Sequence, residues 1–145
     1  MKTVVALPGE GIGLEVVDAT CELLAGTGLP LKILTPPQGA AAVKSHGVGL
    51  PEETKRAARE ADGVLFGAAG GPATPAVVTW LRWQMNAWAG VRPIRFYMGL
   101  ATEAERLESA VGRVYRDGKT LTPDQGGTAT TREMAQAVLA AYRNA

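Results

Sequence analysis

The stretch Thr3-Val4-Val5-Ala6-Leu7-Pro8-Gly9-Glu10-Gly11-Ile12-Gly13 decides the fold of this chain. Its first five residues form an apolar, β-branched run that ends at Pro8-Gly9, which predicts a buried parallel strand running into a loop. The residues that follow, from Leu14 to Leu24, mix apolar and acidic positions. They predict an amphipathic helix that stops near Gly26 and Gly28.

The same alternation of strand and helix continues along the rest of the sequence. Further strands are predicted at residues 31–34, 63–67 and 92–98, and further helices at 51–61, 75–89, 101–116 and from 130 or 131 to 142. Thr130 and Glu133 have the spacing of a capping box at the start of the last helix. Strands that alternate with helices favour an α/β fold, here a three-layer domain with a mainly parallel sheet.

Composition narrows the class of protein. The chain has 145 residues, of which 46% are hydrophobic and 20% charged, so we expect an ordered domain of ordinary size. A net charge of +1 gives no reason to expect a nucleic-acid partner. No long apolar run or secretory signal is visible, so no membrane association is expected. The single cysteine, Cys21, fits a reducing compartment, and the predicted location is cytoplasmic.

Four motifs occur in a defined order. The first is Leu7-Pro8-Gly9-Glu10-Gly11-Ile12-Gly13-Leu14-Glu15-Val16, and the second is Phe66-Gly67-Ala68-Ala69-Gly70-Gly71-Pro72. The third joins Leu81-Arg82 to Val91-Arg92-Pro93, and the fourth is Thr122-Pro123-Asp124-Gln125-Gly126-Gly127-Thr128-Ala129-Thr130-Thr131. Together they resemble the signatures of the β-decarboxylating dehydrogenases, the isocitrate/isopropylmalate dehydrogenase family. The resemblance implies a fold like the first domain of isopropylmalate dehydrogenase.

The resemblance is interrupted between Leu100 and Ala101. In the family, both ends of the chain build the first domain and the middle builds the second. The resemblance therefore implies a single domain over residues 1–145, in which segments 1–100 and 101–145 pack together and the central part is lacking. That part carries the family's catalytic lysine and tyrosine and its metal-binding aspartates. We therefore expect no metal site and no autonomous activity as an NAD-dependent dehydrogenase.

The motifs also suggest binding residues. By motif match, Arg82 and Arg92 correspond to arginines that hold substrate carboxylates, a task that suits the planar guanidinium. Gly11 and Ile12 of the first loop, with Gly70 and Gly71 of the second, correspond to cofactor-binding positions. The remaining cofactor loop of the family has no match, so the site for NAD is incomplete; NAD stays open as a cofactor, and no other cofactor is expected. Tight turns explain the same glycines without any ligand.

One predicted helix carries three tryptophans, Trp80, Trp83 and Trp88, beside the two arginines. A small core rarely buries three such rings, so this helix predicts an interface in a homo-oligomer or hetero-complex. Three functions remain open. The chain is a binding or partner subunit, a miniaturised enzyme acting on a small carboxylic acid in the retained cleft, or a domain without activity. In the second case His46, predicted in a surface loop, Glu10 or Asp124 would be recruited.

Overall fold

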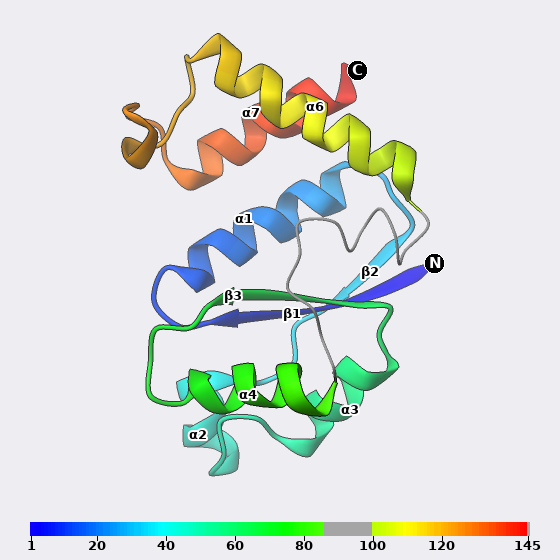
Figure 1. Ribbon diagram of the computed structural model, residues 1–145, viewed down its shortest axis with the longest axis vertical. Helices are drawn as coiled ribbons and strands as arrows, with labels where there is room; N and C mark the ends of the chain where they lie inside the picture. Colours follow the sequence, from blue (N-terminus) through cyan, green and yellow to red (C-terminus); the bar gives the residue numbers. More distant parts are fainter. Residues whose placement is uncertain (86–99, 145) are drawn as a thin grey trace. The chain divides into compact units, whose positions relative to one another are not determined.

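The computed structural model describes residues 1–85 and 100–144, and Figure 1 shows their helices and strands. The chain divides into two compact units. The sheet unit consists of Met1–Asp18 and Pro30–Val91, and the helical unit consists of Ala19–Leu29 and Arg92–Ala145. The described elements, in chain order, are β1 (Lys2–Gly9), α1 (Gly13–Gly26), β2 (Leu31–Leu34), α2 (Gly39–His46), α3 (Glu52–Glu60), β3 (Gly63–Ala68), α4 (Thr74–Gln84), α6 (Ala101–Asp117), a 3₁₀ turn (Pro123–Gln125) and α7 (Thr131–Arg143).

The described residues of the sheet unit form a parallel sheet of three strands in the order β2-β1-β3. Val5 lies opposite Leu34 of β2 on one side and opposite Val64 of β3 on the other. The apolar run quoted at the start of the sequence is therefore the central strand. The predicted α/β class and mainly parallel sheet are confirmed, with the sheet flanked by helices as in a three-layer domain.

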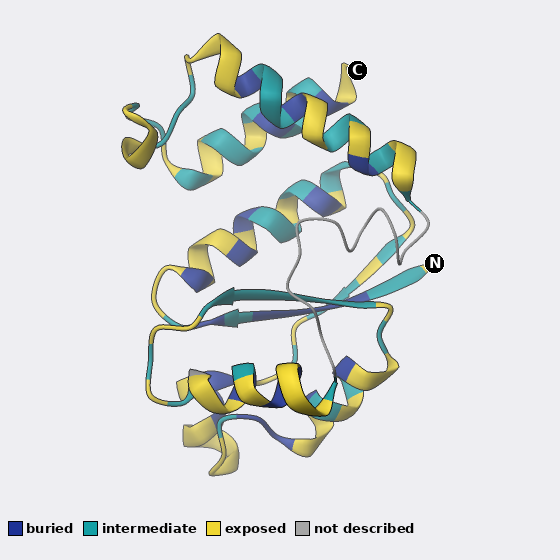
Figure 2. Cartoon of the chain, in the orientation of Figure 1, coloured by how far each residue is buried: buried dark blue, intermediate teal, exposed yellow. Residues whose placement is uncertain are grey.

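The side chains of successive residues of β1 point to opposite faces of this sheet. Val5 and Leu7 are fully buried in a cluster with Leu50, Ala58 of α3, and Val77, Trp80 and Leu81 of α4. Because side chains of a strand alternate, Val4 and Ala6 face the other side, where the first turns of α1 lie (Figure 1). Both faces of β1 are therefore covered, and Figure 2 shows this strand buried through its centre. That burial explains why its sequence is continuously apolar.

The helical unit is closed by packing between α6 and α7. Ala110 and Val114 of α6 are buried against Val138 and Tyr142 of α7. The Arg106 guanidinium lies 4.6 Å from the centre of the Tyr142 ring. At the start of α7, Thr130 and Glu133 form the predicted capping box.

Most predicted elements are confirmed within one to three residues, including the strand at 31–34 and the helices at 14–24, 51–61 and 101–116. The helix α2 was not predicted from the sequence, and the prediction that His46 lies in a loop was wrong, since His46 is the last residue of that helix. Pro51 precedes α3 as its N-cap and is not its first helical residue. The predicted strand at 92–98 and the end of the predicted helix at 75–89 lie outside the described residues.

Within residues 1–85 and 100–144, none of the helices combines the length and apolar character needed to span a membrane. The expected packing of segments 1–100 and 101–145 into one domain stays a prediction.

Candidate functional site

The two glycine-containing loops of the sheet unit meet at the carboxyl ends of β1 and β3. Gly9 pairs with Ala68 at the end of the two strands, and the Glu10 amide donates a hydrogen bond to the Ala68 carbonyl (3.0 Å). A Cβ atom on Gly13 would collide with the Pro8 carbonyl and with the Ala68 backbone nitrogen. Glycine at this position therefore lets α1 begin directly against β3. Ligands of open α/β sheets bind at this edge.

Glu10 ties three segments together at this edge. Its Oε1 accepts a hydrogen bond from the Ala40 amide (3.0 Å) in the first turn of α2. A carboxylate is favourable there because the N-terminus of a helix carries partial positive charge. Its Oε2 lies where a Cβ of Gly71 would stand. Glu10 is therefore engaged in holding α2 and the Gly71 loop against the end of β1.

Gln38, which the sequence analysis did not identify, completes this arrangement. Only 8% of its surface is exposed, and its Nε2 donates a hydrogen bond to the Gly9 carbonyl (3.0 Å). Its Oε1 is buried and has no hydrogen-bond partner among the described residues. Pro36 and Pro37 precede Gln38 in the sequence, and no local pattern indicates that this glutamine will fold back onto another loop.

The four predicted cofactor residues lie at the same edge. Gly11 has a left-handed backbone (φ 62°), and neither Gly11 nor Gly70 has an atom within 4 Å of where a Cβ would stand. Ile12 is 73% exposed. Gly71 differs, because the Glu10 carboxylate occupies the space that a side chain at position 71 would need. Their assignment to a cofactor stays a prediction, and Gly11 and Gly70 offer the open backbone.

The structure describes one of the two arginines predicted to bind carboxylates. Arg82 lies exposed in the last turn of α4. The helix α4 begins at Thr74, just after the glycine loop. Arg82 is eight residues further on, which corresponds to about 12 Å along the helix axis. Arg92 lies outside the described residues. Arg82 therefore lies about two helical turns along α4 from the glycine loop, and the substrate role of both arginines stays a prediction.

Trp80 and Trp83, on the same helix, have opposite environments. Trp80 is 9% exposed within the core of the sheet unit, where the Arg59 guanidinium lies 5.2 Å from its ring centre. Trp83 is 79% exposed. This matches the prediction that α4 cannot bury all of its tryptophans. Trp88 lies outside the described residues.

His46 lies at the opposite end of α2 from the contact between Glu10 and Ala40. His46 ends α2 six residues after Ala40, about 9 Å further along the helix. Its Nδ1 lies 2.7 Å from the Ser45 hydroxyl, and its Nε2 lies 3.4 Å from a Glu53 carboxylate oxygen. His46 therefore joins α2 to α3.

Asp124 belongs to the helical unit. Hydrogen bonds from the Thr122 hydroxyl and then the Gln125 amide hold the pKa of its carboxyl below the ordinary value. These bonds hold the carboxylate within the 3₁₀ turn Pro123–Gln125, which precedes α7. Cys21 is partly buried on α1. No group of three or more His, Cys, Asp or Glu side chains in the described parts of the chain is arranged to hold a metal ion.

Comparison with known proteins gives a consistent picture. Residues 3–102 match the family model described as isocitrate/isopropylmalate dehydrogenase. The 3-isopropylmalate/3-methylmalate dehydrogenase of Methanocaldococcus jannaschii is 36% identical over 118 residues, which cover 81% of this chain and 35% of that protein. The 3-isopropylmalate dehydrogenase of Archaeoglobus fulgidus is 40% identical over 113 residues, covering 78% of this chain and 34% of that protein. The matches thus span about a third of the length of these relatives.

Proposed function

This chain belongs to the isocitrate/isopropylmalate dehydrogenase family, and we propose that it acts as a binding or partner subunit without decarboxylating dehydrogenase activity of its own. The observation that carries the proposal is the exposure of Trp83 on α4. The neighbouring Trp80 is buried, so α4 packs through one side and presents a large ring on another.

The chemistry of this part of α4 suits a protein interface. Tryptophan and arginine are enriched among the residues that dominate binding energy, and Arg82 lies exposed beside Trp83. An exposed tryptophan gains apolar burial when a second chain covers it. The partner is a second copy of this chain or a longer member of the same family. The cytoplasm, where a lone cysteine stays reduced, is the proposed location.

Replacing Trp83 tests the interface. We expect Trp83→Ala to weaken self-association, or association with a full-length relative, by about 2 kcal/mol, a roughly 30-fold rise in Kd. Tyr115→Ala, which removes a half-exposed ring from α6, should leave association unchanged. Analytical ultracentrifugation measures both. A chain that is monomeric alone and with the relative contradicts the proposal.

An enzyme assay tests the second part of the proposal, that the chain alone lacks dehydrogenase activity. The purified chain should not reduce NAD with isopropylmalate or isocitrate in the presence of Mg²⁺, because the family's base, acid and metal ligands have no match in the sequence. A turnover of about 1 s⁻¹ or more, the low end for ordinary enzymes, would refute this part of the proposal.

A second candidate is a miniaturised enzyme that binds a small carboxylic acid. The observation that favours it is the open backbone of Gly11 and Gly70 at the carboxyl edge of the sheet. If Arg82 supplies a carboxylate contact, Arg82→Gln should weaken isopropylmalate binding about tenfold, whereas Arg116→Gln should not. Isothermal calorimetry decides this, and equal binding by both variants removes Arg82 from the site.

A further inference from the structure

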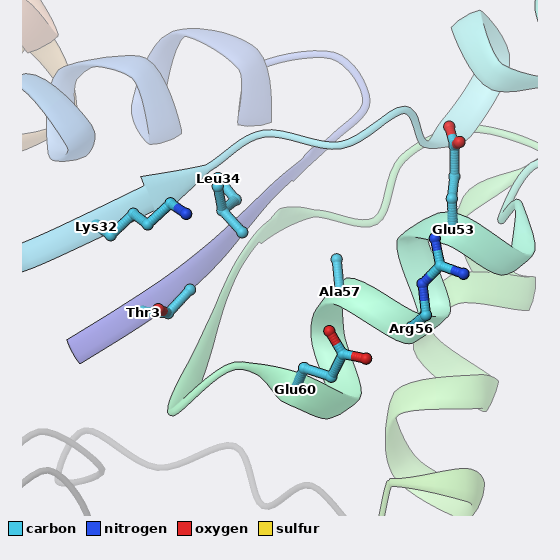
Figure 3. A pocket seen from close by; sticks show the side chains of 7 residues that line it. All are labelled: Thr3, Lys32, Leu34, Glu53, Arg56, Ala57 and Glu60. Carbon is cyan, nitrogen blue, oxygen red and sulfur yellow. The ribbon is translucent and has the colours of Figure 1, made fainter. Parts of the chain in front are cut away.

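We propose that a pocket between β2 and α3, remote from the glycine loops, binds a small amino acid through its carboxylate and ammonium groups. The pocket has a volume of about 360 Å³ and is shown in Figure 3. This volume is at the lower end of the range for small-molecule sites, which is about 300–1,000 Å³. The proposal does not depend on the partner-subunit function.

The pocket is formed by one face of a strand and one face of a helix. Lys32 and Leu34 are two residues apart on β2, so both project from the same side of that strand. On α3 the lining residues have the spacing i, i+3, i+4 and i+7, which places them along one helix face. They are Glu53, Arg56, Ala57 and Glu60, and Thr3 of β1 completes the lining. All come from the sheet unit.

The charges in this pocket are mostly unpaired. An oxygen of the Glu53 carboxylate lies 3.4 Å from Nε2 of His46. Within the described residues, Lys32, Arg56 and Glu60 make neither a salt bridge nor a side-chain hydrogen bond. Arg56 and Glu60 are four residues apart on one helix, a spacing that permits pairing, yet they remain separate. Two cations and one carboxylate therefore face the same small space without a partner.

This set of charges selects the ligand class. A guanidinium binds a carboxylate through two parallel hydrogen bonds, and a lysine ammonium adds a second point of attraction. Glu60, as a carboxylate, accepts hydrogen bonds from a ligand ammonium. Leu34 and Ala57 supply apolar surface for a carbon chain. Arg56 and Lys32 can each receive one carboxylate and Glu60 one ammonium, so an acidic amino acid, with two carboxylates and one ammonium, matches the three unpaired groups one for one.

L-Glutamate and glutarate test the assignment, because they share both carboxylates and only glutamate carries an ammonium group. Isothermal calorimetry on the full chain should show glutamate binding with at least tenfold higher affinity than glutarate. Arg56→Gln and Lys32→Met should each lower glutamate affinity about tenfold. Glu60→Gln should lower glutamate affinity by a similar factor and leave glutarate affinity unchanged or raised.

Lys44→Met and Arg116→Gln are the matched controls, since both residues are exposed and neither lines the pocket. Both variants should bind glutamate like the unaltered chain. Binding of glutarate as tight as that of glutamate overturns the amino-acid assignment. No heat of binding at about 10 mM glutamate, or binding that survives Arg56→Gln and Lys32→Met in variants with unchanged circular dichroism, overturns the site itself.

Discussion

In the sheet unit, glycines let the backbones of different elements touch, whereas in the helical unit side chains hold the helices together. The close backbone approach of Gly127 to the Leu121 carbonyl lies within the connection between α6 and α7. Gly13 and Gly67 each leave space for the Pro8 carbonyl. In the helical unit, side chains make the contacts between helices. Tyr142 of α7 packs in the core of the unit, and the Arg143 guanidinium donates two hydrogen bonds to the Gly26 carbonyl (3.1 and 2.8 Å). Added atoms at Gly13 or Gly67 should therefore be tolerated poorly, whereas the α6–α7 pair should respond mainly to lost side-chain contacts.

The largest expected effect comes from the core of the sheet unit. Leu7→Ala should lower the free energy of unfolding by about 4 kcal/mol, because a fully buried leucine leaves a cavity. We propose that segments 1–100 and 101–145 form one cooperative domain. If so, hydrogen exchange in α7 should accelerate together with exchange in β1.

Val138→Ala, in the helical unit, is the reciprocal variant and should accelerate exchange in β1 as well. Suppose that hydrogen exchange in Leu7→Ala accelerates in β1 but stays unchanged in α7. The two units would then unfold independently, which contradicts the single-domain prediction.

The next largest loss of stability should come from adding a methyl group where two backbone segments lie close together. Gly13→Ala should destabilise the chain by about 3 kcal/mol, because the new Cβ overlaps backbone atoms of Pro8 and Ala68 that cannot move independently. Gly70→Ala, where the Cβ enters open space, should change stability by no more than about 0.5 kcal/mol. Urea unfolding of the two variants measures the contrast, and similar midpoints would contradict the close approach.

Loss of a single cap in the helical unit should cost less. The Thr130 hydroxyl accepts a hydrogen bond from the Glu133 amide (3.2 Å), and Thr130→Ala removes it, with an expected loss of about 1 kcal/mol. Thr128→Ala, an exposed position outside the capping box, is the control. Thermal unfolding followed by circular dichroism should separate them, and equal melting temperatures would show that the cap contributes nothing.

The smallest expected effect is a pH dependence at the same cap. Hydrogen bonds from the Thr130 amide and then its hydroxyl hold the pKa of the Glu133 carboxyl below its ordinary value. A lowered folded-state pKa means that the contribution is complete above the unfolded-state pKa, about 4.3 for glutamate, and is lost as the pH falls through the folded-state value. Glu133→Gln should therefore flatten the decline in stability below about pH 5. An unchanged acid limb in urea titrations would contradict this.

Local sequence determined most elements, because periodicity, glycine and proline signals act over a few residues. The β1 run, the strand at 31–34 and the Thr130 capping box follow from such patterns, and so does the family, whose motifs are short and ordered. The helix α2 was missed because its sequence, Gly39-Ala40-Ala41-Ala42-Val43-Lys44-Ser45-His46, begins with glycine and has no capping side chain of its own. Glu10, 30 residues earlier, supplies the acceptor for its first turn.

Tertiary structure alone decided which residues meet. The sequence marks Gly71 as part of a glycine-rich loop, but only the fold shows that Glu10 requires it to lack a side chain. Gln38 carries no local signal, and its burial depends on the approach of the β1 and β2 loops. The pocket of Lys32, Arg56 and Glu60 likewise joins a residue of β2 to residues of α3, with α2 and its flanking loops between them in the sequence. Contacts of this kind depend on long-range chain geometry, which no short sequence pattern encodes.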